Sequence, residues 1–195
     1  LLDVNQFDRR VDEDLAAIED ARFALVRLMV SWKVLEPQVG QYDERAVDRF
    51  EDLIAAARER KLQVIVCFFA DDRHAELAEV PWGKKRDPRT DNYLVQREVA
   101  LVQKLVARLR TDSGVFAWQL ADEAFCSGFK TAGALEAWTR QLREAIREIG
   151  YTEQGIGFDA DSCGIMVALH RQSPVFQKCL LARRLGHQPL DLLVP

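Results

Sequence analysis

Short apolar segments alternate with longer amphipathic ones along most of this chain, and this alternation limits the fold more than any other feature. Residues 24–30, 63–69 and 115–120 are apolar runs of strand length, and residues 154–158 form a shorter run of the same kind. Near-continuous apolar runs are typical of strands that are covered on both faces. Strands separated by helices predict parallel βαβ units.

Between these strands, apolar residues recur at helical spacing. They predict helices over residues 11–22, 44–61, 91–110 and 135–149. Asp43 is placed to cap the second of these helices. A doubly wound open sheet would normally carry a glycine-rich phosphate loop after its first strand. Neither GxGxxG nor GxxxxGK[ST] occurs in the sequence, which favours a (β/α)8 barrel.

The length indicates that this barrel is incomplete. The chain has 195 residues, whereas a whole (β/α)8 barrel takes about 250. We therefore expect an α/β fold with one partial TIM barrel domain over residues 1–195, containing barrel strands 2 to 5 or 6 with their helices. Within it, residues 165–195 have poor periodicity and are poorly defined, with residues 190–194 as a candidate for one more strand.

Composition excludes several classes of protein. Hydrophobic residues make up 48% and charged residues 30%, as in soluble globular proteins. No apolar run approaches the roughly 18 residues of a membrane span. The net charge of −4 has interspersed signs, so we expect neither nucleic acid nor a membrane as partner. The first residues lack the features of a signal peptide, which leaves the cytoplasm and secretion with a missing signal both open.

No pattern in the sequence indicates a bound metal or cofactor. The four cysteines show neither a CxxC pair nor the spacing of a zinc site. The three histidines stand in no recognisable arrangement of nucleophile and base. We therefore expect no metal and no cofactor.

The residues best placed for catalysis follow the third strand. In a (β/α)8 barrel, catalytic groups lie at the carboxyl ends of the strands, and here the strand leads directly into Asp122 and Glu123. Mutual repulsion of two neighbouring carboxylates raises at least one pKa, as a general acid requires near neutral pH. Spacing alone leaves another interpretation open, in which both residues open a solvated loop or cap a helix.

Three segments resemble the retaining glycosidases of clan A, especially glycoside hydrolase family 5, the cellulases and mannanases. Residues 118–124 (Trp-Gln-Leu-Ala-Asp-Glu-Ala) are similar to the Trp-x-Leu-x-Asn-Glu-Pro motif at the end of that family's fourth strand. Residues 26–32, together with 36–43, resemble the strand-2 block. Residues 59–66 resemble the entry to strand 3. The matches occur in the family's order and cover roughly residues 11–159.

The resemblance implies a role for each matching residue. Glu123 is in the place of the acid/base that protonates the leaving oxygen, and Asp122 in that of an asparagine that binds the sugar 2-hydroxyl. Arg27 matches the arginine that supports the nucleophile. Three tryptophans are candidate sugar platforms, although each is also ordinary core or loop material: Trp32, Trp82 and Trp118.

The sequence also departs from the family pattern. Asp122 replaces the asparagine and Ala124 replaces the proline. A retaining glycosidase needs a second carboxylate about 5–5.5 Å from the first; in this family it follows strand 7, beyond the strands expected here. We therefore expect a hydrolase of β-linked glycans such as glucan or mannan in the complete protein, with this chain an incomplete or inactive portion. Exposed strand edges of a partial barrel also predict self-association.

Two alternatives remain at this point. In the first, a metal-dependent barrel of the enolase type holds Mg²⁺ with Glu123, one of Asp71 and Asp72, and one of Asp159 and Asp161. In the second, a degenerate barrel binds glycan without catalysis. Sensitivity to chelation would identify the first, and identical behaviour of the wild type and Glu123→Gln would favour the second.

Overall fold

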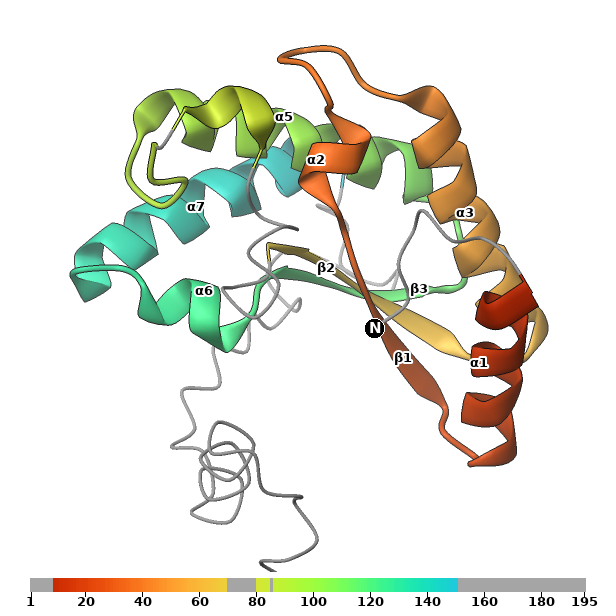
Figure 1. The fold of residues 1–195 in the computed structure, drawn as a ribbon. Coiled ribbons are helices and arrows are strands. Elements are labelled where there is room, and N and C mark those ends of the chain that lie inside the picture. Colours follow the sequence, from red (N-terminus) through yellow and green to blue (C-terminus); the bar gives the residue numbers. More distant parts are fainter. Residues whose placement is uncertain (1–8, 70–79, 85, 151–195) are drawn as a thin grey trace, which may run out of the picture. The chain divides into compact units, whose positions relative to one another are not determined.

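The computed structural model describes residues 9–69, 80–84 and 86–150, with the backbone alone at residues 9, 10, 123 and 124. All of them belong to one compact unit, Leu1–Ile165. Figure 1 shows the elements in chain order: α1 (Arg9–Asp20), β1 (Leu25–Met29), α2 (Trp32–Leu35), α3 (Glu44–Glu59), β2 (Gln63–Phe69), the 3-10 turn η2 (Pro81–Gly83), α5 (Asn92–Leu109), β3 (Val115–Ala121), α6 (Glu123–Ser127) and α7 (Ala132–Glu148).

The described strands form one parallel sheet in the order β1-β2-β3. Arg27 is paired with Ile65, and Ile65 with Ala117, while the register shifts between Val64 and Ile65. Each strand is followed by a helix before its parallel neighbour begins. These are the predicted βαβ units, and consecutive strands are neighbours, as in a (β/α)8 barrel.

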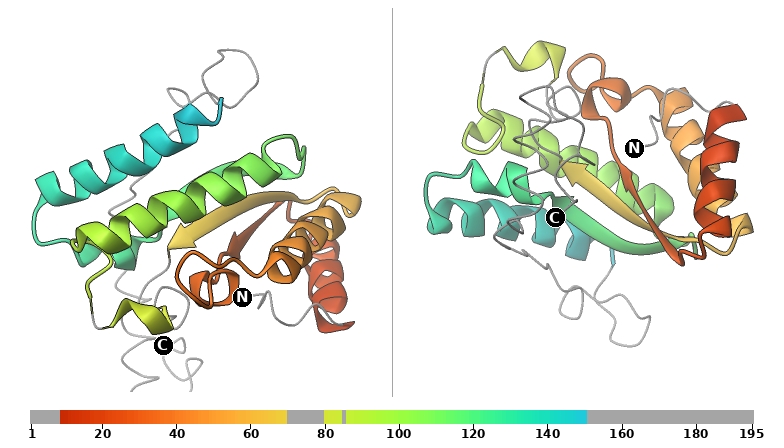
Figure 2. Two further views of the ribbon diagram at one scale, coloured as in Figure 1. Left: turned by 90° about the horizontal axis from the view of Figure 1, so that it is seen from above. Right: turned by 60° about the horizontal axis from the view of Figure 1, so that its bottom comes forward.

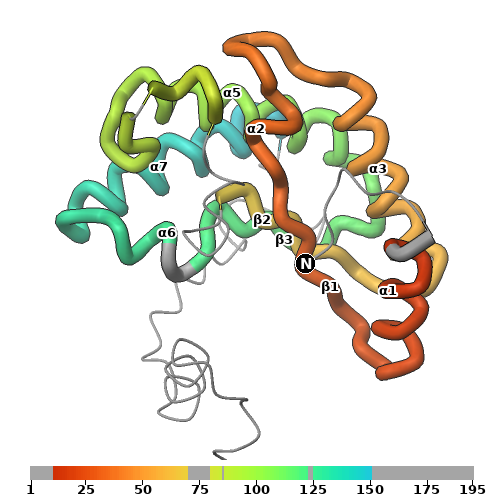
Figure 3. The backbone as a smooth tube through the Cα atoms, in the orientation of Figure 1, coloured from red at the N-terminus to blue at the C-terminus, as the bar shows by residue number. Residues whose placement is uncertain are grey.

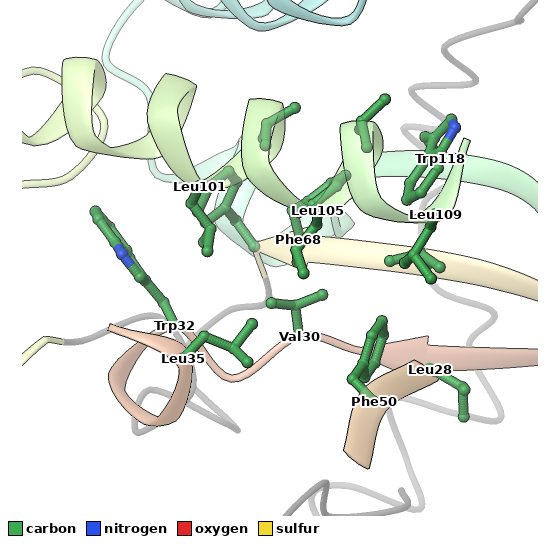
Figure 4. Packing of buried hydrophobic residues seen from close by; sticks show 14 of the residues in the cluster. Leu28, Val30, Trp32, Leu35, Phe50, Phe68, Leu101, Leu105, Leu109 and Trp118 are labelled. Carbon is green, nitrogen blue, oxygen red and sulfur yellow. The ribbon is translucent and has the colours of Figure 1, made fainter. Parts of the chain in front are cut away.

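The two faces of the sheet differ in what covers them. On one face, Leu28, Val66 and Trp118 lie side by side and belong to the main hydrophobic core. Figure 4 shows leucines of α5 and Phe50 of α3 packed against this face. On the opposite face, Met29 and Cys67 form a separate small cluster. A sheet with helices on its outer face and packed side chains on its inner face is the arrangement of a barrel wall.

The helices begin where side chains cap them. Asp43 accepts hydrogen bonds from the amides of Arg45 and Ala46, at 3.0 and 3.2 Å, which confirms the cap predicted for α3. Asp91 and Thr131 cap α5 and α7 in the same way. Once started, α5 packs along α7 (Figure 2), and α3 contacts both β2 and α1.

Most of the predicted elements are confirmed, with boundaries shifted by a few residues. α7 begins three residues before the predicted start at 135 because Thr131 caps it there. The sequence did not predict the short elements α2, η2 and α6. The predicted strands at 154–158 and 190–194 lie outside the described residues. In the described ranges, no helix is long and apolar enough to cross a membrane.

Candidate active site

The predicted acid/base follows the end of β3 and is the first residue of α6, which lies between β3 and α7 along the chain (Figure 3). Asp122 caps this helix, since its carboxylate accepts a hydrogen bond of 2.9 Å from the amide of Phe125. The amide of Asp122 in turn donates to the carbonyl of Phe69, the last residue of β2, at 2.9 Å. Asp122 is therefore a helix cap, as one interpretation of the sequence held, and it fixes the backbone that leads into Glu123.

Arg27 lies in the middle of β1, on the face of the sheet opposite the helices, and its side chain is exposed. It lies close enough to Cys67 on β2 to act on the thiol electrostatically, and Asp122 does the same. Burial raises the pKa of Cys67 to about 12; Arg27 opposes this rise, and Asp122 and Cys126 add to it. The structure thus gathers Arg27 and Asp122, two of the predicted site residues, around one buried thiol.

A second thiol lies beside Asp122. Burial raises the pKa of Cys126 to about 11; Asp122 adds to the rise and Arg89 opposes it. Cys67 and Cys126 are both buried and free of a disulfide. A thiol whose pKa is raised remains protonated near neutral pH and is a poor nucleophile. These two cysteines therefore act as small apolar side chains around the strand ends.

Two of the three candidate sugar platforms are core side chains. Trp32 is 0% exposed, and its indole N–H donates to the Glu36 carboxylate at 2.8 Å. Trp118 points to the helix side of β3 and stacks on Phe68, with ring centroids 5.7 Å apart. Within the described part of the chain, neither ring presents a face to a sugar. Both are explained by packing, the alternative stated for them from the sequence.

Trp82, the third candidate, is only partly buried. Its indole N–H donates to the backbone carbonyl of Glu36 at 2.9 Å. Its ring meets Trp32 edge-on at 5.6 Å and Tyr93 at 6.4 Å. Of the three tryptophans, Trp82 alone combines a fixed orientation with solvent access.

Sequence reasoning missed the network that fixes the loop between β1 and α3. Glu36 is 0% exposed, and its carboxylate accepts hydrogen bonds from Trp32, from the amide of Gly40 and from Arg97 of α5. Burial raises the pKa of Tyr42 to about 12; Glu36 adds to this rise and Arg97 opposes it. The Glu-Pro-x-x-Gly-x-Tyr-Asp block was noted in the sequence. Its partner Arg97 was not, because it lies 61 residues from Glu36.

A second buried carboxyl group, Glu98 of α5, was also missed. It is 0% exposed, and its Oε2 accepts a hydrogen bond of 2.7 Å from the indole N–H of Trp138. Burial raises the pKa of Glu98 well above its ordinary value, although the bond from Trp138 and the charge of Arg89 oppose the rise. Trp138 also packs on Phe125 of α6, with ring centroids 5.4 Å apart. Glu98 thus supports the helix that starts at Glu123.

The metal-binding alternative gains nothing from the described part of the chain. There, no group of three or more His, Cys, Asp and Glu residues is arranged to hold a metal ion. The carboxylates that this alternative needs besides Glu123, namely Asp71, Asp72, Asp159 and Asp161, lie outside the described residues.

Comparison with known proteins decides the family. The model of the cellulase family, glycosyl hydrolase family 5, matches residues 4–160. This chain belongs to glycosyl hydrolase family 5. The resemblance stated for residues 26–32, 36–43, 59–66 and 118–124 is confirmed, and with it the membership of clan A.

Solved structures of family 5 proteins share the fold. The exo-β-1,4-mannosidase Op5Man5 from Opitutaceae bacterium strain TAV5 is 24% identical with a TM-score of 0.66, over 75% of this chain and 27% of that one. GH5_18 from Streptomyces cattleya, crystallised with GlcNAc, is 22% identical with a TM-score of 0.66, over 75% and 38%. Endo-glycoceramidase II from Rhodococcus sp. is 22% identical with a TM-score of 0.62, over 74% and 42%. The family 5 chain therefore has part of a (β/α)8 barrel, as predicted.

Two curated proteins share a short stretch with this family 5 chain. The S-adenosylmethionine synthase of Roseiflexus castenholzii is 61% identical over 33 residues, which are 17% of this chain and 8% of the synthase. That of Gloeobacter violaceus is 50% identical over 48 residues, 25% of this chain and 12% of the synthase. The chain thus spans about a tenth of the length of these relatives.

Proposed function

We propose that this chain is the acid/base-bearing portion of a retaining glycoside hydrolase that acts on β-linked glycans such as glucan or mannan. One observation carries the proposal: Asp122 and Glu123 follow β3 directly, and Arg27 on β1 and Asp122 both act on the thiol of Cys67 between them. A barrel of this kind gathers its catalytic groups at the carboxyl ends of its strands. Membership of glycosyl hydrolase family 5 supports the reaction class.

In the proposed mechanism, Glu123 protonates the glycosidic oxygen as the bond to the anomeric carbon breaks, and then removes a proton from the attacking water. The neighbouring carboxylate of Asp122 favours the protonated form that the first step requires. Asp122 also accepts a hydrogen bond from a sugar hydroxyl. Arg27 balances the negative charge of the nucleophile, and Trp82 is the tryptophan best placed to meet a sugar ring.

We further propose that the nucleophile is not on this chain. The chain spans 27–42% of the three solved relatives described above, which supports a partial site. The names of those relatives include a β-1,4-mannosidase and a complex with a cellobiose-like imidazole, which supports β-linked sugars as the substrate class. The matches to S-adenosylmethionine synthases cover a quarter of the chain or less, which is too short a stretch to indicate a function.

The experiment supplies the missing nucleophile from solution. Azide attacks the anomeric carbon of an aryl β-mannoside or β-glucoside, the glycosidic bond breaks, and Glu123 gives its proton to the leaving phenolate. We expect azide-dependent release of phenol by the wild type. Because general acid catalysis contributes at least about 10²-fold, Glu123→Gln should lower the rate by that factor.

The matched control is Glu136→Gln, the same change at a carboxylate of α7 that is 72% exposed and bonded to Arg140. It should behave as the wild type does. Equal rates for all three proteins, or no release by the wild type, would refute the proposed function. Glycan binding that persists without any turnover would instead favour a non-catalytic barrel.

A further inference from the structure

The helix that starts at Glu123 is too short to hold its own position. α6 has five residues, and isolated helices shorter than about 12 residues are marginal in water. Its place in the fold is therefore set by contacts from outside the helix. At its first turn, the cap from Asp122 is one such contact.

Arg89, in the loop between β2 and α5, holds the other end of this helix. Its Nε donates a hydrogen bond of 2.8 Å to the carbonyl of Phe125, and its guanidinium carbon lies 4.7 Å from the centroid of the Phe125 ring. Asp87 orients Arg89, since Asp87 Oδ1 accepts a hydrogen bond of 3.0 Å from the Arg89 amide and pairs with its guanidinium at 3.4 Å. One arginine thus binds both the backbone and the side chain of Phe125.

Gly128, which ends α6, fits Arg89 closely. Its φ of −75° and ψ of −10° are ordinary helical values that any residue adopts, so its backbone does not require glycine. A Cβ at this position would lie 2.3 Å from Nε and 2.4 Å from Cζ of Arg89. The absence of a side chain at residue 128 is therefore explained by the space that the guanidinium occupies.

Phe125 links the contact with Arg89 to the end of β2. It is 1% exposed, and its ring lies 5.8 Å from that of Phe69, the last residue of β2, and 5.4 Å from that of Trp138. Phe69 also accepts the hydrogen bond from the amide of Asp122. Contacts through Phe125 and Phe69 thus connect Arg89, between η2 and α5, with the residue that precedes Glu123.

We propose that Arg89, seated against Gly128, is a positioning residue for the acid/base: it fixes α6 and with it the place from which Glu123 projects. This inference rests on the proposed function. It assigns to Arg89, between η2 and α5, the task of aligning the acid with the glycosidic oxygen. Since small errors in such alignment are costly, loosening α6 should reduce kcat more than it raises KM.

The test uses three variants: Arg89→Ala, Gly128→Ala and the double variant that combines these two changes. Arg86→Ala is the matched control. Arg86 lies in the same loop but bonds Asp91 and lies over Tyr93 instead. Amide hydrogen exchange is followed by mass spectrometry in a peptide covering residues 122–130, and circular dichroism confirms folding. Loss of a charge-assisted hydrogen bond should speed amide exchange in α6 roughly tenfold or more in Arg89→Ala and in Gly128→Ala. Arg86→Ala should leave it unchanged.

The double variant makes the test specific. If Gly128→Ala acts by displacing Arg89, it should add nothing once Arg89 is alanine. Additive effects, or wild-type exchange in Arg89→Ala, would overturn the inference. Measuring azide-dependent turnover distinguishes a failure of the positioning role of Arg89 from a failure of the proposed function. If Glu123→Gln slows turnover but Arg89→Ala changes only exchange, the positioning role fails and the function stands, whereas a wild type without turnover refutes both.

Discussion

Two buried carboxyl groups, Glu36 and Glu98, differ in the hydrogen bonds that replace contact with water. Removing a carboxylate from water is costly unless it is paired and hydrogen-bonded. Glu36 accepts hydrogen bonds from several donors, including the guanidinium of Arg97. Among the described residues, Glu98 accepts one hydrogen bond, from Trp138, and burial raises its pKa well above the ordinary value. Burial therefore favours the protonated form of Glu98.

Stability should depend on pH through Glu98. In the unfolded chain this carboxyl ionises near its ordinary pKa of 4.5, whereas in the folded chain it keeps its proton to a higher pH. The stabilisation that Glu98 contributes to the folded chain is fully present below the unfolded-state pKa of 4.5, and it is lost as the pH rises through the raised pKa of the folded state. Relative to Glu98→Gln, which cannot ionise, the wild type should lose at most about 1.4 kcal/mol per pH unit in this range. Urea unfolding at a series of pH values measures the difference.

The matched control for this change is Glu144→Gln, at a side chain of α7 that is 55% exposed and pairs with Arg147. The stability of Glu144→Gln should depend on pH as that of the wild type does. If the stability of Glu98→Gln also followed the wild-type pH dependence, the pKa of Glu98 would not be raised in the folded chain, contrary to this interpretation.

Arg97 should contribute to the stability of the fold, because its guanidinium pairs with the buried side chain of Glu36. Arg97→Ala leaves a fully buried carboxylate with only Trp32 and Gly40 as hydrogen-bond donors among the described residues. Since the Arg97 side chain is 22% exposed and water can reach the gap, we expect a loss of about 3 kcal/mol, the lower end for a broken buried pair. Arg140→Ala, which breaks an exposed pair with Glu136, should cost less than about 0.5 kcal/mol. Equal losses in urea unfolding would contradict the assigned role of Glu36.

At the scale of elements, periodicity was sufficient for long helices and insufficient for short ones. α3 and α5 were predicted because each buries one regular apolar stripe against the sheet. α6 could not be predicted, since its position depends on Arg89 and Trp138, which are far from it in sequence. The strand-end position of Asp122 followed from the strand boundary alone. The position of Arg97 beside Glu36 could not be predicted, because the two residues are 61 positions apart and no local sequence pattern joins different elements.

The cap of α3 offers a test at this scale. Asp43→Ala removes an acceptor for the amides of Arg45 and Ala46, and the usual cost of such a loss is about 1 kcal/mol. Asp43→Asn keeps an acceptor oxygen and should cost much less. Urea unfolding of both variants checks the prediction. A similar loss for alanine and asparagine would show that charge, and not the hydrogen bond, stabilises this end of α3.

At the scale of the whole molecule, the feature that matters most is the edge of the described sheet that β1 forms. Among the described strands, β1 pairs with β2 alone. Phe23 and Leu25, beside its amino end, are 64% and 36% exposed. A complete barrel closes such edges, whereas an open one invites pairing with another chain.

We therefore expect the purified chain to self-associate as its concentration rises, in sedimentation velocity or light scattering. Leu25→Lys places a charge on the edge strand and should shift the equilibrium toward the monomer, as natural edge strands use lysine to prevent pairing. Val39→Lys is the matched control, because Val39 is also exposed, at 45%, but lies outside the sheet. If the wild type stays monomeric at every concentration, or both lysine variants dissociate it equally, the edge of β1 is not the surface through which the chains associate.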